Sequence, residues 1–67
     1  MKVVFEQRDR NGLHIEVMGD GLSLGVMRRA YDWSGWFWHP YGRPMKESVM
    51  LGRDTYRAKV KLRKMLS

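Results

Sequence analysis

A nine-residue aromatic segment, residues 33–41, constrains the fold of this chain more than any other part. It reads Trp-Ser-Gly-Trp-Phe-Trp-His-Pro-Tyr and holds all three tryptophans of the protein. A large aromatic side chain removes about 150–250 Å² from water when it is buried. A fold that left this segment in solvent would forgo much of its stabilisation, so we expect the segment to supply the centre of the core.

Alternation along this segment divides it between two faces. In an extended strand Trp36 and Trp38 point to one side, while Phe37 and His39 point to the other. Pro40 ends the strand, because proline has no N–H to give to a neighbouring strand. We expect Trp36 and Trp38 to pack beneath a helix. The side of Phe37 is then either covered by a loop or exposed to a ligand or partner, and the sequence leaves these alternatives open.

The chain length, 67 residues, allows one domain with one core, near the size at which stability becomes marginal. Because cysteine is absent, the chain can form no disulfide, thiolate metal site or thiol nucleophile. No apolar run approaches the roughly 18–20 residues that span a bilayer, and the N-terminus meets a charge too early for a secretory signal. We therefore expect a single domain over residues 1–67, located in the cytoplasm and without membrane contact.

The first two strands are predicted over residues 3–8 and 13–18, joined at Asn11-Gly12. Asn-Gly is typical of a hairpin, because a type I′ turn needs positive φ at both central residues and these residue types tolerate it best. Apolar and polar residues alternate along the second strand. Its inward side is predicted to comprise Leu13, Ile15 and Val17, and its outward side His14, Glu16 and Met18.

A third strand is predicted over residues 22–28, after a Gly-Asp-Gly turn. Its apolar residues Leu22, Leu24 and Val26 alternate, so we expect them on one face. Gly25 weakens a strand interior. Its presence therefore indicates a bulge or the close approach of a neighbouring bulky ring.

The C-terminal part is predicted to hold a short strand at residues 47–51 and then a helix. Residues 56–63 alternate between apolar and basic, which is strand periodicity, but the tail forms one apolar stripe when it is wound as a helix. Strong helix formers make up the tail, and Asp54 or Thr55 precedes it as an N-cap, so we choose the helix. The stripe would consist of Ala58, Leu62, Met65 and Leu66. The resulting fold class is α+β: an antiparallel meander of four to five short strands with one C-terminal helix packed on one face.

Charge is the main functional signal in the sequence. Thirteen Lys and Arg against seven Asp and Glu give a net charge of +6 and a sequence pI near 10.2. Such an excess attracts nucleic acid or an acidic protein surface, although a charge of about 2–8 also serves solubility alone. Aromatic faces beside cations hold single-stranded nucleic acid, at about 1–3 kcal/mol per stacked base, and the same residue types form protein–protein hot spots. The candidate nucleic-acid-binding residues are Arg28, Arg29, Tyr31, Trp33, Phe37, Tyr41, Arg43 and Lys46.

Catalysis and metal binding find little support in the sequence. His14 and His39 fall on different predicted strands, with no cysteine and no paired carboxylate motif beside them. Ser34, Ser48 and Thr55 lack a nucleophile motif. We therefore expect a protein that is not an enzyme and that carries no metal or cofactor.

One family resemblance covers about two-thirds of the chain, from Leu24 to Leu66. The matching residues are Leu24-Gly25-Val26 with Arg28-Arg29, Trp36-Phe37-Trp38, Leu51-Gly52, Thr55 and Ala58. They resemble small DNA-binding domains with a three-stranded sheet and a helix: the arm-binding domains of phage-type tyrosine integrases and the apetala-type domains of plant transcription factors. In that family the sheet enters the major groove. The resemblance implies DNA contacts at Arg28, Arg29, Trp36 and Trp38.

Three hypotheses for function follow. The first is a small non-enzymatic module that binds nucleic acid, most of all DNA, through a sheet and loop surface of Arg and aromatic residues backed by the basic helix. The second is an interaction module of the kind that phages encode, which binds and modulates an acidic protein in the host cytoplasm. The third is a structural or oligomeric domain. The sequence does not decide between a monomer and a homodimer.

Overall fold

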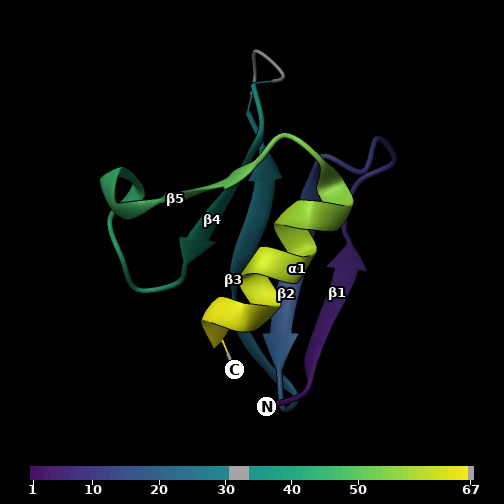
Figure 1. Ribbon diagram of the computed structural model, residues 1–67. Coiled ribbons are helices and arrows are strands. Elements are labelled where there is room, and N and C mark those ends of the chain that lie inside the picture. The colour runs from purple at the N-terminus through teal and green to yellow at the C-terminus, as the bar shows by residue number, and fades with distance from the viewer. Residues whose placement is uncertain (31–33, 67) are drawn as a thin grey trace.

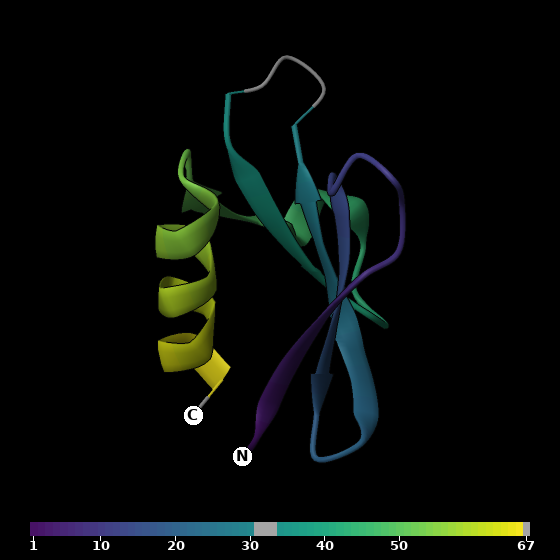
Figure 2. The same ribbon diagram turned by 90° about the vertical axis from the view of Figure 1, so that its right-hand side faces the viewer.

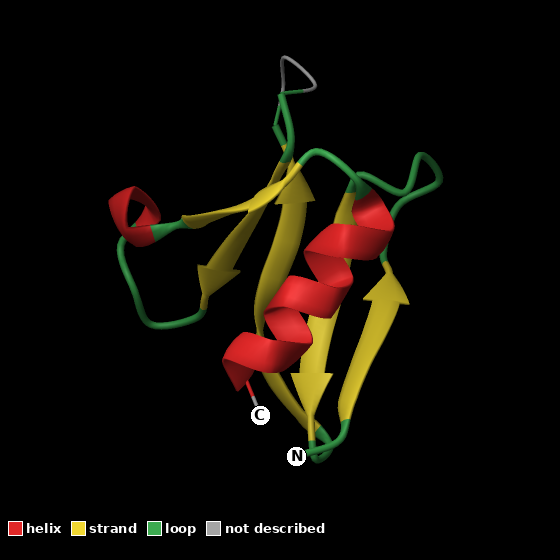
Figure 3. Cartoon of the chain, in the orientation of Figure 1, coloured by secondary structure: helices red, strands yellow, loops and turns green. Residues whose placement is uncertain are grey.

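A five-stranded antiparallel sheet carries one helix on one of its faces (Figures 1 and 3), which confirms the predicted α+β fold. The structure is a computed structural model, and it describes residues 1–30 and 34–66. The strands lie side by side in chain order, each antiparallel to its neighbour. The elements are β1 (Val3–Gln7), β2 (His14–Gly19), β3 (Leu22–Arg29), β4 (Trp36–Pro40), the 3₁₀ turn η1 (Met45–Glu47), β5 (Val49–Gly52) and α1 (Thr55–Leu66).

The core lies between the sheet and α1, and two tryptophans form its centre. Trp36 and Trp38 are buried, as predicted, and pack with Leu51 of β5 and with Ala58 and Leu62 of α1. Strands β2 and β3 complete the buried cluster with Ile15, Val17 and Met27. The placement follows from strand alternation, because residues two apart on β4 share a face.

Helix α1 begins where the predicted cap lies. The backbone N–H of Arg57 donates to the Asp54 carboxylate at 2.9 Å, which is the bond an N-cap side chain makes. Thr55, the other predicted cap, has a different role: its hydroxyl accepts a hydrogen bond of 3.0 Å from the indole N–H of Trp36. This bond joins the start of the helix to the aromatic strand and satisfies the one polar atom of a buried tryptophan.

Three members of the predicted helical stripe face the sheet. Ala58 and Leu62 are buried, and Leu66 is half-buried and packs against the core. Met65 is 45% exposed, so its predicted place in the stripe is wrong.

A β-bulge at Leu24 changes the phase of β3. The register passes from Val17 opposite Gly25 to Met18 opposite Ser23, which leaves Leu24 as an extra residue. Leu24 packs against the core, whereas Val26 lies on the other face and Leu22 is 69% exposed. The prediction that these three residues share one face is therefore wrong, because the bulge interrupts the alternation.

Gly25 was predicted to mark a bulge or the close approach of a bulky ring, and both occur. It lies beside the bulge, and a Cβ at this position would come within 2.7 Å of the Trp38 ring and 2.8 Å of the Pro40 Cα. Only glycine lets β3 and β4 approach so closely.

The tight type I′ turn predicted between the first two strands occurs instead between β2 and β3. The β1–β2 hairpin is confirmed, but its connection spans residues 8–13 and only Gly12, not Asn11, has positive φ among them. The Asp9 carboxylate fixes this loop by accepting from the N–H groups of Leu13 at 3.0 Å and His14 at 3.3 Å. Positive φ at two successive residues occurs instead between β2 and β3, at Asp20 (50°) and Gly21 (84°), the pattern of a type I′ turn.

The last predicted strand begins later than expected. Residues 45–47 form η1, where the N–H of Glu47 donates to the Pro44 carbonyl at 2.9 Å, and β5 starts only at Val49. The prediction of strand from residue 47 is therefore wrong for Glu47 and Ser48. Pro44 pre-sets the backbone angle of this turn and favours it over an extended start.

Candidate nucleic-acid interface

The sheet has a face turned away from α1, which we call the open face (Figure 2). Its side chains alternate with those of the core, and directly opposed residues on neighbouring strands share it. From β1 to β4 the open face includes Val4, Glu6, His14, Glu16, Met18, Val26, Arg28, Phe37 and His39. The described candidate residues other than Arg29 lie on this face or in the loop beside it.

A pocket of about 440 Å³ opens between β3, β4 and η1. Its lining residues are Arg28, Arg29, Ala30, Phe37, His39, Met45 and Ser48. Arg28 and Phe37 are direct cross-strand partners, so their side chains are neighbours on the open face. Phe37 is half-buried and lines the pocket, so it is neither fully covered nor fully exposed.

The two predicted arginines lie on different faces. Arg28 is exposed on the open face, and neither ion pair between described side chains uses it. Arg29 lies on the helix side, with its guanidinium carbon 5.8 Å from the centre of the Trp36 ring. Both border the pocket. Of these two arginines, Arg28 is the one that brings an exposed guanidinium to the open face itself.

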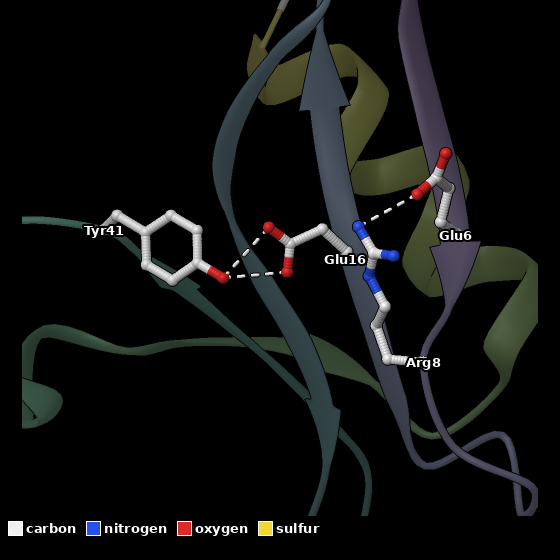
Figure 4. A network of polar contacts seen from close by, with 4 residues as sticks. All are labelled: Glu6, Arg8, Glu16 and Tyr41. Atoms are coloured by element: carbon white, nitrogen blue, oxygen red, sulfur yellow. Dashed lines mark hydrogen bonds and ion pairs between the residues drawn. The ribbon is translucent and has the colours of Figure 1, made fainter.

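Tyr41 reaches across the open face to Glu16 (Figure 4). Its hydroxyl donates to the carboxylate, at 2.8 Å from Oε2 and 3.0 Å from Oε1. Because β3 lies between β4 and β2, this bond spans three strands. Glu16 is only 8% exposed, whereas 51% of Tyr41 is exposed. The ring of Tyr41 is thus held in one position while much of it remains open to solvent.

The electrostatics of this pair favour an ionised glutamate beside a neutral tyrosine. The hydrogen bond from Tyr41 lowers the pKa of Glu16, and this outweighs the burial of the carboxylate, which acts in the opposite direction. The Ser23 hydroxyl and the charges of Arg8 and His14 lower it further. The bond to Glu16 and burial together raise the pKa of Tyr41. Arg8 itself forms an ion pair with Glu6 at 3.0 Å (Figure 4).

The loop after β4 is fastened to the sheet at more than one point. Besides the Tyr41 bond, the His39 Nε2 donates to the Arg43 carbonyl at 2.9 Å, since a carbonyl oxygen can only accept. The guanidinium of Arg43 lies 3.7 Å from the Glu47 carboxylate. Arg43 and Lys46 are exposed. The loop therefore presents these two cations beside the pocket from a constrained backbone.

Two of the candidate residues are not described, and two of the implied DNA contacts fall on buried side chains. Tyr31 and Trp33 lie outside the described residues. Trp36 and Trp38 are 1% and 4% exposed, so the DNA contacts that the family resemblance implies for them are wrong. Their rings face the helix, and the side chains between and beyond them face the open side.

Sequence reasoning missed five residues of this site, one of them Ala30, which follows β3 and lines the pocket. His39 was predictable as a neighbour of Phe37, because alternation places both on the side opposite the tryptophans. Met45 and Ser48 join the pocket through η1, which no pattern indicated. The sequence predicted Glu16 only as an outward strand residue, because its hydrogen-bond partner, Tyr41, lies 25 positions away.

No protein-family model, curated protein or solved structure matches this chain. Within residues 1–30 and 34–66, no group of three or more His, Asp or Glu side chains is placed to hold a metal ion. No helix in the described part of the chain is long and apolar enough to cross a membrane.

Proposed function

We propose that this protein binds single-stranded nucleic acid, with DNA as its first expected ligand, through the open face of the sheet. One observation carries the proposal: strand register places an exposed arginine, Arg28, directly beside an aromatic ring, Phe37, in the wall of an open pocket. An unstacked base enters this pocket and stacks on Phe37, while Arg28 binds the adjoining phosphate or base edge. Both contacts are common to proteins that hold single strands.

The dimensions and charges of the site support a nucleotide ligand. The pocket volume of about 440 Å³ lies within the roughly 300–1,000 Å³ of typical small-ligand pockets. Arg43 and Lys46 are exposed on the adjoining loop, where they can contact the backbone on either side of the bound base. Of the acidic groups nearby, Glu16 is bonded to Tyr41 and Glu47 is paired with Arg43.

The test compares two variants of the pocket with a control variant that removes one positive charge elsewhere on the surface. We expect Arg28→Gln to weaken binding of a short single-stranded DNA about tenfold in fluorescence anisotropy, equivalent to about 1.4 kcal/mol. Phe37→Leu keeps an apolar side chain but removes the stacking surface, and should weaken binding at least fivefold. The control is Lys2→Gln, because Lys2 is exposed beside the β2–β3 turn, at the other end of β3 from Arg28.

Equal losses for Arg28→Gln and Lys2→Gln would contradict the proposal, because net charge alone would then explain binding. A parallel titration with polyglutamate tests the acidic protein partner that the sequence left as the alternative. If polyglutamate bound as tightly as DNA and depended equally on Arg28 and Phe37, the open face would be a protein-binding surface instead.

A further inference from the structure

The net charge of the protein is concentrated in one element. Residues 1–52 contain seven Lys and Arg and six Asp and Glu, whereas residues 53–67 contain six Lys and Arg and one Asp. The sheet is therefore nearly neutral, and the segment of α1 carries five of the six net positive charges. Its one acid, Asp54, is engaged as the helix cap.

This charge lies on the opposite side of the sheet from the pocket. Helix α1 packs on the core side through Ala58 and Leu62, and Figure 2 shows it along the face away from the open one. The pocket is instead lined mainly by open-face residues, by the end of β3 and by residues of and beside η1. A stiff duplex segment that lies along α1 cannot also enter the pocket. The helix is therefore a separate surface and not an extension of the open face.

The basic side chains line both flanks of α1. On the β1 side, Lys59 and Arg63 lie over the ring of Phe5, with distances of 5.4 and 5.1 Å to its centre. On the β5 side, the Lys61 ammonium donates to the Met50 carbonyl at 3.4 Å, and Arg57 lies one turn earlier on the exposed surface. These contacts hold the aliphatic stems against the fold and leave the charges at its surface.

The spacing suits a regular array of phosphates. Arg57 and Lys61 are four residues apart, about 6 Å along the helix axis, and Arg53 is a further exposed cation just before the helix. The ion pairs between described side chains join Arg8 to Glu6 and Arg43 to Glu47, so they use none of these three cations. Duplex DNA presents one negative charge per about 1.7 Å of its axis, and a row of cations binds it by releasing counterions.

We propose that α1, with Arg53, binds the phosphate backbone of duplex nucleic acid without reading bases, independently of the open face. Together the two surfaces let one molecule hold a single strand on one side and a duplex on the other. A membrane is a poor alternative because the apolar stripe of α1 is buried against the sheet and cannot insert into lipid. Protein hot spots centre on aromatic or Arg anchors in packed pockets, and the described pocket lies on the other face.

The decisive test is the salt dependence of duplex binding for two matched double variants. Arg57→Gln/Lys61→Gln removes two cations from α1, and glutamine keeps a helix propensity close to that of Arg and Lys. Lys2→Gln/Arg10→Gln removes two exposed cations outside the helix. We expect the helix variant to lower the slope of log K against log salt for a 20-bp duplex by up to about 1.8 units, and the control by less than about 0.5. Equal changes in the two variants would overturn the proposal.

Two further readouts separate this surface from the open face and from other anions. Arg28→Gln and Phe37→Leu should leave duplex affinity within twofold of wild type. If they lost as much duplex affinity as single-strand affinity, both ligands would bind the open face and a second surface would be refuted. Anionic vesicles and polyglutamate should bind at least tenfold more weakly than the duplex, and equal binding would refute the assignment to nucleic acid.

A bridging experiment tests the consequence directly. A donor-labelled single strand and an acceptor-labelled duplex of unrelated sequence should show energy transfer only when protein is added. The helix double variant should abolish this transfer while it retains single-strand binding. Displacement of the single strand by the duplex would show that the two ligands share one surface, and would overturn the proposal.

Discussion

Replacing Tyr41 by phenylalanine should destabilise the protein by about 1.5 kcal/mol at neutral pH. The substitution removes one hydroxyl, which donates to the Glu16 carboxylate at 2.8 Å. A hydrogen bond to a charged group contributes about 1.5–3 kcal/mol. We use the lower end of this range because 51% of Tyr41 is exposed, so water can partly replace its hydroxyl. The loss is still substantial because Glu16 is only 8% exposed, and water reaches its carboxylate poorly.

The effect should depend on pH in a defined direction. The pKa of Glu16 is lowered below its ordinary 4.5 in the folded protein, so the ionised carboxylate contributes stability above pH 4.5 and loses it as the pH falls through the lowered value. The pKa of Tyr41 is raised above its ordinary 10.0, so its contribution is present below pH 10 and is lost as the pH rises through the raised value. The difference between wild type and Tyr41→Phe should therefore be largest between these limits.

The assay is urea denaturation followed by tryptophan fluorescence, at pH 7 and at pH 3. The matched control is Tyr56→Phe, because Tyr56 is 75% exposed on α1 and loses the same atom. We expect that control to change the free energy of unfolding by less than about 0.5 kcal/mol at both pH values. If Tyr41→Phe and Tyr56→Phe behaved alike, or if the Tyr41 effect were as large at pH 3 as at pH 7, the bond to ionised Glu16 would not stabilise the fold.

Three further predictions concern the core and its helix. Gly25→Ala should destabilise by about 1–3 kcal/mol and lower the thermal midpoint, because the new Cβ meets the His39 carbonyl oxygen and the Pro40 Cα, which are backbone atoms; an unchanged midpoint would mean that β3 and β4 can separate freely. Asp54→Ala should cost about 1 kcal/mol through loss of the helix cap, with Asp54→Asn retaining most of the stability; equal losses would point to charge instead of capping. Thr55→Val should cost about 1–2 kcal/mol, because it leaves the indole N–H of a buried tryptophan without its acceptor; urea denaturation unchanged from wild type would show that water replaces the hydroxyl.

The fold was predictable where one physical rule acted alone. Alternation on β4 placed Trp36 and Trp38 in the core and Phe37 on the opposite side, since any other phase would expose two tryptophans. The tail offered two periodicities. Only the helix could bury Ala58 and Leu62 together after a capping residue, and helix is what forms.

Prediction failed where a distant contact or an irregularity decided the outcome. The bulge at Leu24 shifts the phase of β3 by one residue, and alternation cannot reveal this although Gly25 signalled a disturbance. Asn11-Gly12 does not form the predicted tight turn, because the Asp9 carboxylate binds backbone N–H groups of a longer loop. Asp20-Gly21 has the same chemistry without such a competitor and turns tightly.

The candidate site shows the same division. Its pairing of Arg28 with Phe37 follows from strand order and register, which are local rules extended across a hairpin. The fastening of Tyr41 to Glu16 joins residues 25 positions apart, and neither side chain signals its partner in the sequence. The concentration of charge on α1 was visible in the composition of the tail. Its separation from the open face became clear only when the helix was placed on the other side of the sheet.

An NMR titration of the isotope-labelled protein with a short single-stranded DNA tests the open-face proposal most directly. We predict that the largest chemical-shift changes occur at Arg28, Phe37 and His39 and that the Phe37 ring signals move upfield through base stacking. In Arg28→Gln the same changes should need about tenfold more DNA. Shifts spread evenly over all basic side chains, or confined to α1 while Phe37 stays unchanged, would contradict a ligand-binding open face.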